Sequence, residues 1–204
     1  MNKEVMQIQT PLGEFSWVTI SGKGKDYVSK LGKSDNNYKY FVSIMLSKQD
    51  GAKLIKDIET EYSNSSHYLP VPDGRRPYYV IAKEQTEVNS KGNQHHVIAD
   101  IGKVVFKFST GTKWPDGGHK SINVYNSRGI DITEDFKETK IANGSLGCVN
   151  GTFGIYDRGC TLYLDAIQIA KLIEYKQGNG FADVGEGYTG NENKTFAPVT
   201  KLEL

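Results

Sequence analysis

The fold prediction depends most on residues 140–156, which read Lys140-Ile-Ala-Asn-Gly-Ser-Leu-Gly-Cys-Val-Asn-Gly-Thr-Phe-Gly-Ile-Tyr156. Its pattern is that of a β-strand in which glycines recur at intervals. Glycine inside a strand marks a point where the strand bends sharply or a neighbouring chain approaches closely. We therefore expect a strongly bent strand here, of the kind that closes a small barrel.

Further strands are expected on both sides of this segment. Alternating apolar residues with β-branched and aromatic side chains predict strands at 13–20, 37–46, 78–83, 95–109 and 122–125. The run Thr161–Tyr175 fits a helix as well as a strand. We favour a strand, because Leu162-Tyr-Leu164 begins as an alternation after a glycine turn.

A single helix is predicted at 48–62. Ser47 and Asp50 form a capping box ahead of apolar residues at helical spacing. Loops are expected at 63–77 and 110–119. Bent strands with one helix predict a mainly β protein, namely a five-stranded OB-fold barrel with one packed α-helix and extended loops.

The chain has 204 residues and a net charge of +1. This length predicts one domain at 1–182, followed by a flexible, mildly acidic tail at 183–204. The near-zero charge excludes a histone-like polycation, but charge is unevenly distributed. Residues 101–128 carry a balance of +4 and residues 129–204 a balance of −4. A basic middle with an acidic end is the first indication of function.

Motifs for enzymatic chemistry are weak. No G-x-S-x-G surrounds a serine, and no Cys or His spacing suits a metal. His95 and His96 are adjacent in a predicted strand, so their rings should point to opposite faces. A run of carboxylates at 131–138 leaves a metal-dependent nuclease as an alternative, although an acidic loop is the simpler interpretation. We predict no cofactor and no metal.

Basic and aromatic residues interleave repeatedly, which is the pattern that sequence-independent binding of single-stranded DNA requires. Cations would follow the phosphates while aromatic rings stack on the bases. Predicted phosphate contacts are Lys103, Lys107, Lys113, Lys120, Arg128 and Arg158, and predicted stacking residues are Trp114, Tyr156 and either Tyr38 or Tyr40. Lys39, between those two tyrosines, is a further predicted nucleic-acid-binding residue. Phe106, Phe108 and Tyr125 are expected in the core instead.

Short segments occur in a fixed order along the chain: Tyr38-Lys-Tyr-Phe-Val-Ser-Ile-Met-Leu-Ser-Lys-Gln-Asp50, Val104-Val-Phe-Lys-Phe108, His119-Lys-Ser-Ile-Asn-Val-Tyr-Asn-Ser-Arg-Gly129, Ile141-Ala-Asn-Gly-Ser145, Gly154-Ile-Tyr-Asp-Arg-Gly159 and Leu162-Tyr-Leu-Asp-Ala-Ile-Gln-Ile169. Read together, they resemble the replicative single-stranded-DNA-binding proteins of bacteriophages, of the podophage OB-fold type. The resemblance spans roughly residues 13–188, and its specificity lies in the order of the segments.

This resemblance implies a basic, aromatic-lined groove on an OB barrel. It assigns the family's stacking turn to Tyr156 and Arg158, its basic hairpin to Lys113 and Lys120, and its first-strand loop to Lys23 and Lys25. The family's tail is strongly acidic, whereas residues 183–204 carry a balance of only −2. Such a charge is a weak competitor for a DNA groove in physiological salt.

We therefore expect a non-enzymatic protein that coats single-stranded DNA during phage replication, recombination or repair. Partners implied by the resemblance are phage replication proteins such as a polymerase or helicase–primase, and a homodimer is left open. A phage structural or adaptor protein is a further alternative. The start lacks an apolar signal core and no stretch reaches membrane-span length, so we expect the cytoplasm of the infected host and no membrane contact.

Overall fold

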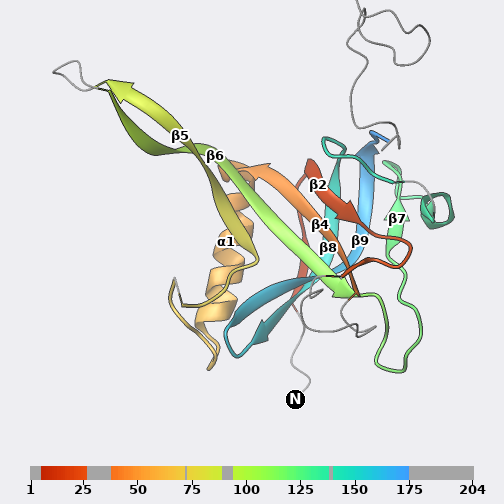
Figure 1. Cartoon of the computed structure of the whole chain (residues 1–204). Coiled ribbons are helices and arrows are strands. Elements are labelled where there is room, and N and C mark those ends of the chain that lie inside the picture. Colours follow the sequence, from red (N-terminus) through yellow and green to blue (C-terminus); the bar gives the residue numbers. More distant parts are fainter. Residues whose placement is uncertain (1–5, 27–37, 72, 89–93, 138–139, 175–204) are drawn as a thin grey trace, which may run out of the picture.

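The computed structural model of the chain describes residues 6–26, 38–71, 73–88, 94–137 and 140–174 (Figure 1). In chain order its elements are β1 (Gln7–Gln9), β2 (Gly13–Thr19), β3 (Lys25–Asp26), β4 (Tyr38–Ser47), α1 (Lys48–Ser63), β5 (Tyr78–Val88), β6 (Gln94–Gly111), β7 (Asn123–Tyr125), the short 3₁₀ helix η2 (Thr133–Phe136), β8 (Leu146–Tyr156) and β9 (Gly159–Lys171). No helix in these ranges has the length and apolarity needed to cross a bilayer.

Five of the strands close a barrel. β2 pairs with β4, β4 with β6, β6 with β9, β9 with β8, and β8 returns to β2. Every pairing in this ring is antiparallel except that of β6 with β9, which meet at Phe108 and Leu162. A closed five-stranded barrel with one α-helix among the described residues is the predicted OB-fold architecture.

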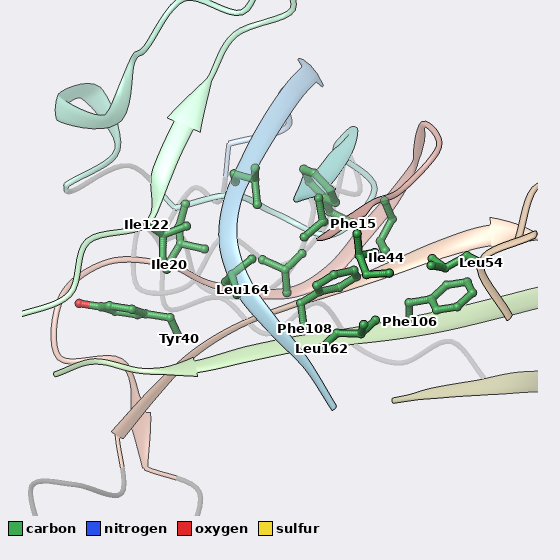
Figure 2. Packing of buried hydrophobic residues seen from close by; sticks show 14 of the residues in the cluster. Phe15, Ile20, Tyr40, Ile44, Leu54, Phe106, Phe108, Ile122, Leu162 and Leu164 are labelled. Atoms are coloured by element: carbon green, nitrogen blue, oxygen red, sulfur yellow. The ribbon is translucent and has the colours of Figure 1, made fainter. Parts of the chain in front are cut away.

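The barrel interior is filled by alternate residues of its strands. In β4 the inward positions are Tyr40, Val42, Ile44 and Leu46, all buried. They meet aromatic rings from β2 and β6 and leucines from β9, as Figure 2 shows for Phe15, Phe106, Phe108, Leu162 and Leu164. The prediction that Phe106 and Phe108 are core residues is confirmed, whereas Tyr125 is only half-buried.

Glycines permit the sharp bends of β8. A Cβ atom on Gly147 would collide with the carbonyl of Gln168, and one on Gly151 with the carbonyl of Tyr163. The register between β8 and β9 shifts at both glycines. The bent strand predicted from the glycine spacing is therefore confirmed.

The N-terminal part of that segment was expected to be strand and is a turn instead. Residues 140–145 precede β8, and the amide of Ser145 bonds to the carbonyl of Ala142 over 3.3 Å. The turn is fastened to β2, because the amide of Gly144 donates to the carbonyl of Phe15 over 3.0 Å. Within this turn, the side chain of Asn143 accepts a hydrogen bond from the amide of Trp17.

Helix α1 begins where the capping box predicts. The hydroxyl of Ser47 accepts a hydrogen bond from the amide of Asp50 over 3.0 Å. Leu54, Ile58 and Tyr62 form the buried face of the helix.

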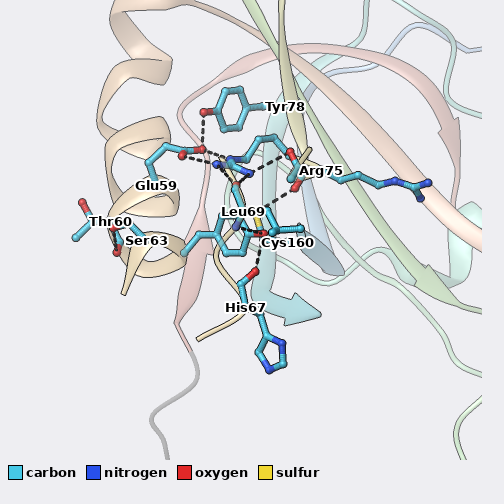
Figure 3. A network of polar contacts seen from close by, with 11 residues as sticks. Glu59, Thr60, Ser63, His67, Leu69, Arg75, Tyr78 and Cys160 are labelled. Atoms are coloured by element: carbon cyan, nitrogen blue, oxygen red, sulfur yellow. Dashed lines mark hydrogen bonds and ion pairs between the residues drawn. The ribbon is translucent and has the colours of Figure 1, made fainter. Parts of the chain in front are cut away.

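A polar network fastens the end of this helix to β5 (Figure 3). The guanidinium of Arg76 donates to both carboxylate oxygens of Glu59, over 2.5 and 3.0 Å, and also lies 4.4 Å from the Tyr62 ring centroid. The hydroxyl of Tyr78 donates to the same carboxylate over 2.7 Å. Arg76 and Tyr78 therefore serve the fold.

β5 and β6 are longer than predicted. They pair from Tyr78 and Phe106 out to Val88 and Gln94 and form a two-stranded ribbon that projects beyond the barrel (Figure 1). The register shifts between Ile81 and Ala82, where the ribbon leaves the barrel.

The ambiguous run after the last turn is a strand, β9, as favoured from the sequence. β9 is paired along most of its length with β8, and also with β6 and β7. The boundary predicted at residue 182 and the predicted tail lie outside the described residues.

Candidate nucleic-acid interface

The outward face of β4 and β6 carries basic and aromatic side chains. Since Tyr40 and Val42 point inward, the intervening Lys39, Phe41 and Ser43 occupy the other face of β4. On β6, Ser109 lies opposite Phe41, and Lys107 lies opposite Ser43. The pairing thus gathers residues from separate parts of the chain into one surface.

A groove of 390 Å³ lies over this face. We call it the central groove; its lining residues are Trp17, Lys25, Lys39, Phe41, Ser43, Tyr79, Lys107, Phe108 and Ser109. Among these described residues are three lysines and no aspartate or glutamate. Two aromatic rings, those of Trp17 and Tyr79, are exposed there, whereas Phe41 and Phe108 are buried. Such a surface attracts anions and offers flat apolar rings at the same place.

Tyr79 provides one of the exposed rings. It is 45% exposed and lies opposite Val105 on β6. The ammonium of Lys107 is 4.7 Å from its ring centroid, within the range of a cation–π contact. A base stacked on Tyr79 would therefore have a cation beside it.

Trp17 provides the second exposed ring and is 65% exposed. Its position results from a bulge. Ser16 lies opposite Ser43, but the next pair is Thr19 with Phe41, so β2 has two residues where β4 has one. Simple alternation from the buried Phe15 would have turned Trp17 inward, whereas the bulge turns it out.

The backbone of Trp17 is strained. Its φ is +52°, a left-handed value that bulky residues rarely adopt. Its amide donates to the side-chain oxygen Oδ1 of Asn143 over 2.9 Å. The ammonium of Lys25 lies 5.9 Å from the Trp17 ring and 6.0 Å from that of Phe41. Strained residues of this kind concentrate at functional sites.

Three of the predicted site residues line the central groove: Lys25, Lys39 and Lys107. Lys103 is exposed on the same outward side of β6 as Lys107, opposite Ser47 of β4. Trp17, Phe41 and Tyr79 were missed. The signal that could have found Tyr79 is its place beside Tyr78 in a period-two strand, since only one of the two can face the core.

The prediction that Tyr40 offers its ring to a base is wrong in this structure. Tyr40 is 5% exposed, and its hydroxyl donates to the carbonyl of Gly22 over 2.9 Å. Burial raises its pKa. Tyr38, the other candidate, is half-buried where β4 pairs with Asp26 of β3.

The predicted basic hairpin forms a separate surface in the 112–122 loop. Trp114 is 51% exposed, and the ammonium of Lys120 lies 4.7 Å from its ring centroid. Lys120 also donates to the hydroxyl of Thr110 over 2.8 Å. Lys113 forms a backbone bridge with His119 at the base of the loop.

The remaining predicted residues lie outside the central groove. Tyr156, which is 40% exposed, ends β8, and Arg158 lies in the turn between β8 and β9. The carbonyl of Arg158 accepts from the amide of Arg75 over 2.9 Å, which fixes this turn against the loop after α1. Arg128 is exposed in the turn after β7, and Lys23 is exposed in the turn before β3.

Two of the carboxylates considered for a nuclease, Asp131 and Glu134, serve local structure. Asp131 accepts hydrogen bonds from the amide and the hydroxyl of Thr133, over 2.8 and 2.6 Å, and these bonds lower its pKa. Glu134 pairs with Lys137 over 2.5 Å. In the part of the chain that the structure describes, no three His, Cys, Asp or Glu residues come together as a metal site. The side chains of His95 and His96 lie outside that part.

Both cysteines are free thiols. Cys160 is buried, and burial raises its pKa to about 11. Burial also raises the pKa of Cys148. Both are therefore protonated near neutral pH, which does not suit a nucleophile.

We compared the chain with known proteins to find others of the same fold. No protein-family model and no curated protein matches the sequence. Among solved structures, the chain is similar to gp2.5, a single-stranded DNA-binding protein encoded by bacteriophage T7, with a TM-score of 0.56 and 18% identity over 92% of this chain and 100% of gp2.5. This likeness shows a shared fold.

A second similar structure is the single-stranded DNA-binding protein from bacteriophage Enc34. Its TM-score is 0.48, with 12% identity over 87% of each chain. The same protein in complex with single-stranded DNA gives a TM-score of 0.47.

Proposed function

We propose that this protein binds single-stranded DNA without sequence preference and that the central groove is where it does so. One observation carries the proposal. Exposed rings of Trp17 and Tyr79 share a groove with three lysines, and no carboxylate is among the described residues that line it. Phosphates need the cations and unpaired bases need the rings, so a single strand satisfies both at once.

The geometry favours a single strand over a duplex. Base planes are hidden within a duplex and cannot stack on side chains, whereas every base of a single strand has an accessible face. The cations among the described lining residues are lysines, whose compact ammonium acts as a point charge and lacks the planar fork of an arginine. Binding without sequence preference follows from that chemistry.

The comparison supports the same function by analogy. The protein whose fold this chain shares, gp2.5, is a single-stranded DNA-binding protein. Fold alone does not determine function, so the analogy gains its weight from the groove. The ordered segments that resemble the phage family point the same way.

We further propose that the protein coats single-stranded DNA during phage replication, recombination or repair, inside the cytoplasm of the infected bacterium. In this proposal the binding domain covers residues 1–182. Lys103, Lys113, Trp114, Lys120, Arg128, Tyr156 and Arg158 extend the contact beyond the groove, together with Lys23 and Tyr38. A phage polymerase or helicase–primase would be the protein partner.

The test is fluorescence anisotropy of a labelled oligothymidylate titrated with the full chain at increasing salt, with a duplex of equal length as control. We expect binding to the single strand, weaker binding to the duplex, and a negative slope of log affinity against log salt, because phosphate contacts release counterions. Equal affinity for both nucleic acids, or no binding at low salt, would overturn the proposal.

A nuclease is tested in the same experiment by adding magnesium or manganese and following the length of the oligonucleotide. We expect the strand to stay intact. Cleavage that is lost in an Asp131→Asn, Asp135→Asn double variant would make the protein an enzyme.

A further inference from the structure

A second cavity adjoins the central groove. Its volume is 550 Å³, and we call it the flanking cavity. Trp17, Lys25 and Phe41 line both the central groove and the flanking cavity, so these three side chains stand at the boundary between the two. Both volumes fall in the range of sites that hold small organic groups.

The far side of the flanking cavity is the 140–143 turn. Lys140, Ala142 and Asn143 line it from there. Lys140 and Asn143 are exposed, and Ala142 is half-buried. The flanking cavity therefore repeats the chemistry of the central groove. It has an aromatic boundary and a lysine at each side, and no aspartate or glutamate is among its described lining residues.

The strained backbone conformation of Trp17 places its ring at the edge that the two cavities share. Without the bulge of β2, its ring would turn toward the core, and neither cavity would have an indole at its edge. The bond from its amide to Asn143 Oδ1 ties the strained residue to the same turn that closes the flanking cavity. A backbone held off its preferred φ needs such a restraint to persist.

We propose that the bound strand crosses the β2 bulge from the central groove into the flanking cavity, with the Trp17 ring between consecutive bases, and that Asn143 is the positioning residue that holds the ring there. This inference rests on the proposed function. It adds a second subsite, in which Lys140 lies beside the phosphate that follows the crossing.

The subsite is tested with Ala142→Leu, which places a larger side chain in the flanking cavity at a residue that does not line the central groove. Affinity of the full chain is measured against oligothymidylates of increasing length. For the native protein we expect affinity to rise once the strand is long enough to pass Trp17. For Ala142→Leu we expect the affinity for the shortest strands to be kept and that rise to be lost. An unchanged length dependence in Ala142→Leu would overturn the inference.

A second variant, Lys140→Gln, tests the subsite independently in case Ala142→Leu does not fold. Lys140→Gln is expected to lower the slope of log affinity against log salt by about one, as for loss of a phosphate contact. Lys53→Gln, which removes the same charge from an 86% exposed side chain on α1, is the matched control and should leave the slope unchanged. Equal slopes for the two variants would count against the subsite.

The role of Asn143 has its own readout. The chain holds two tryptophans, so Trp114→Phe leaves Trp17 as the sole indole. In that background, Asn143→Ala should lower the fluorescence anisotropy of Trp17 and increase its quenching by acrylamide. Asn143→Asp keeps the acceptor oxygen and should restore both values in the free protein. No change on Asn143→Ala would refute the positioning role.

The outcomes separate this inference from the proposed function. If the native protein binds no single strand, both fail. If it binds, and Ala142→Leu and Lys140→Gln behave as the native protein and the Lys53→Gln control do, only the crossing at Trp17 fails.

Discussion

Trp17 and Tyr79 expose 65% and 45% of their surface at the central groove, each with a lysine ammonium beside the ring. Replacing either with Ala should weaken binding of an oligothymidylate by about 1–3 kcal/mol per stacked base. The measurement is anisotropy at fixed salt. Tyr163→Ala is the matched control, because Tyr163 is 47% exposed but does not line the central groove. If Trp17→Ala and Tyr79→Ala both bound the oligothymidylate as tightly as the native protein, stacking on these two rings would not contribute to binding.

Trp114 and Tyr156 remain predicted stacking residues, since the structure describes their exposure and not their contact with a ligand. Both lie outside the central groove and the flanking cavity. We expect Trp114→Ala to cost less affinity than Trp17→Ala, because Trp114 would engage only strands long enough to reach its loop. The affinities of both variants are measured with short and long oligonucleotides. If Trp114→Ala lost as much affinity for the shortest strand as Trp17→Ala does, the main binding site would be in the loop that holds Trp114.

At the scale of elements, the network of Glu59, Arg76 and Tyr78 couples α1 to β5. Burial raises the pKa of Glu59, but the hydrogen bonds from Arg76 and Tyr78 and the charge of Arg76 outweigh it and hold the pKa below its ordinary 4.5. A pKa that is lower in the folded state adds stability above the unfolded value, and this stability is lost as pH falls through the folded value.

Glu59→Gln should therefore lower the free energy of unfolding by about 1–3 kcal/mol near neutral pH. Its difference from the native protein should shrink as the pH falls below 4.5. Urea unfolding across this range measures both. Glu61→Gln removes the same charge from the same helix and is the control. A difference that is independent of pH would show that the carboxylate charge is not what stabilises this contact.

The bends of β8 give a second prediction about elements. Gly151→Ala places a methyl group against the Tyr163 carbonyl and the Phe108 ring and should cost about 1–3 kcal/mol of stability through overpacking. At Gly111, the nearest atom to an added Cβ is 3.6 Å away, so Gly111→Ala should be nearly neutral. Thermal melts distinguish the two, and equal melting temperatures would contradict the account of barrel closure.

For the whole molecule, we predict that the domain ends before the tail. A chain shortened to residues 1–182 should keep the melting temperature of the full chain and bind single-stranded DNA with similar affinity, because a balance of −2 over 183–204 competes weakly for a basic groove in salt. Calorimetry and anisotropy check the two parts. A large gain in affinity on shortening would show that the tail occupies the groove.

The fold could be predicted from the sequence because its signals are local. Apolar alternation marks β4 and β6, the capping box at Ser47 marks α1, and the glycines of β8 mark the bends that close the barrel. Each of these depends on neighbours within a few residues. Only the outer part of β5, residues 84–88, escaped prediction, because its polar sequence carries little alternation, whereas β6 was predicted over almost its whole length.

The kinds of side chain available for binding follow from the sequence, and Lys25, Lys39 and Lys107 were predicted from it. Which of them share a surface depends on the folded chain. Tyr40 is buried while its neighbour Lys39 is exposed, and a two-for-one bulge turns Trp17 outward. The reason is physical: strand register sets which face each residue occupies, and register depends on partners far away in the chain, such as Asn143 for Trp17.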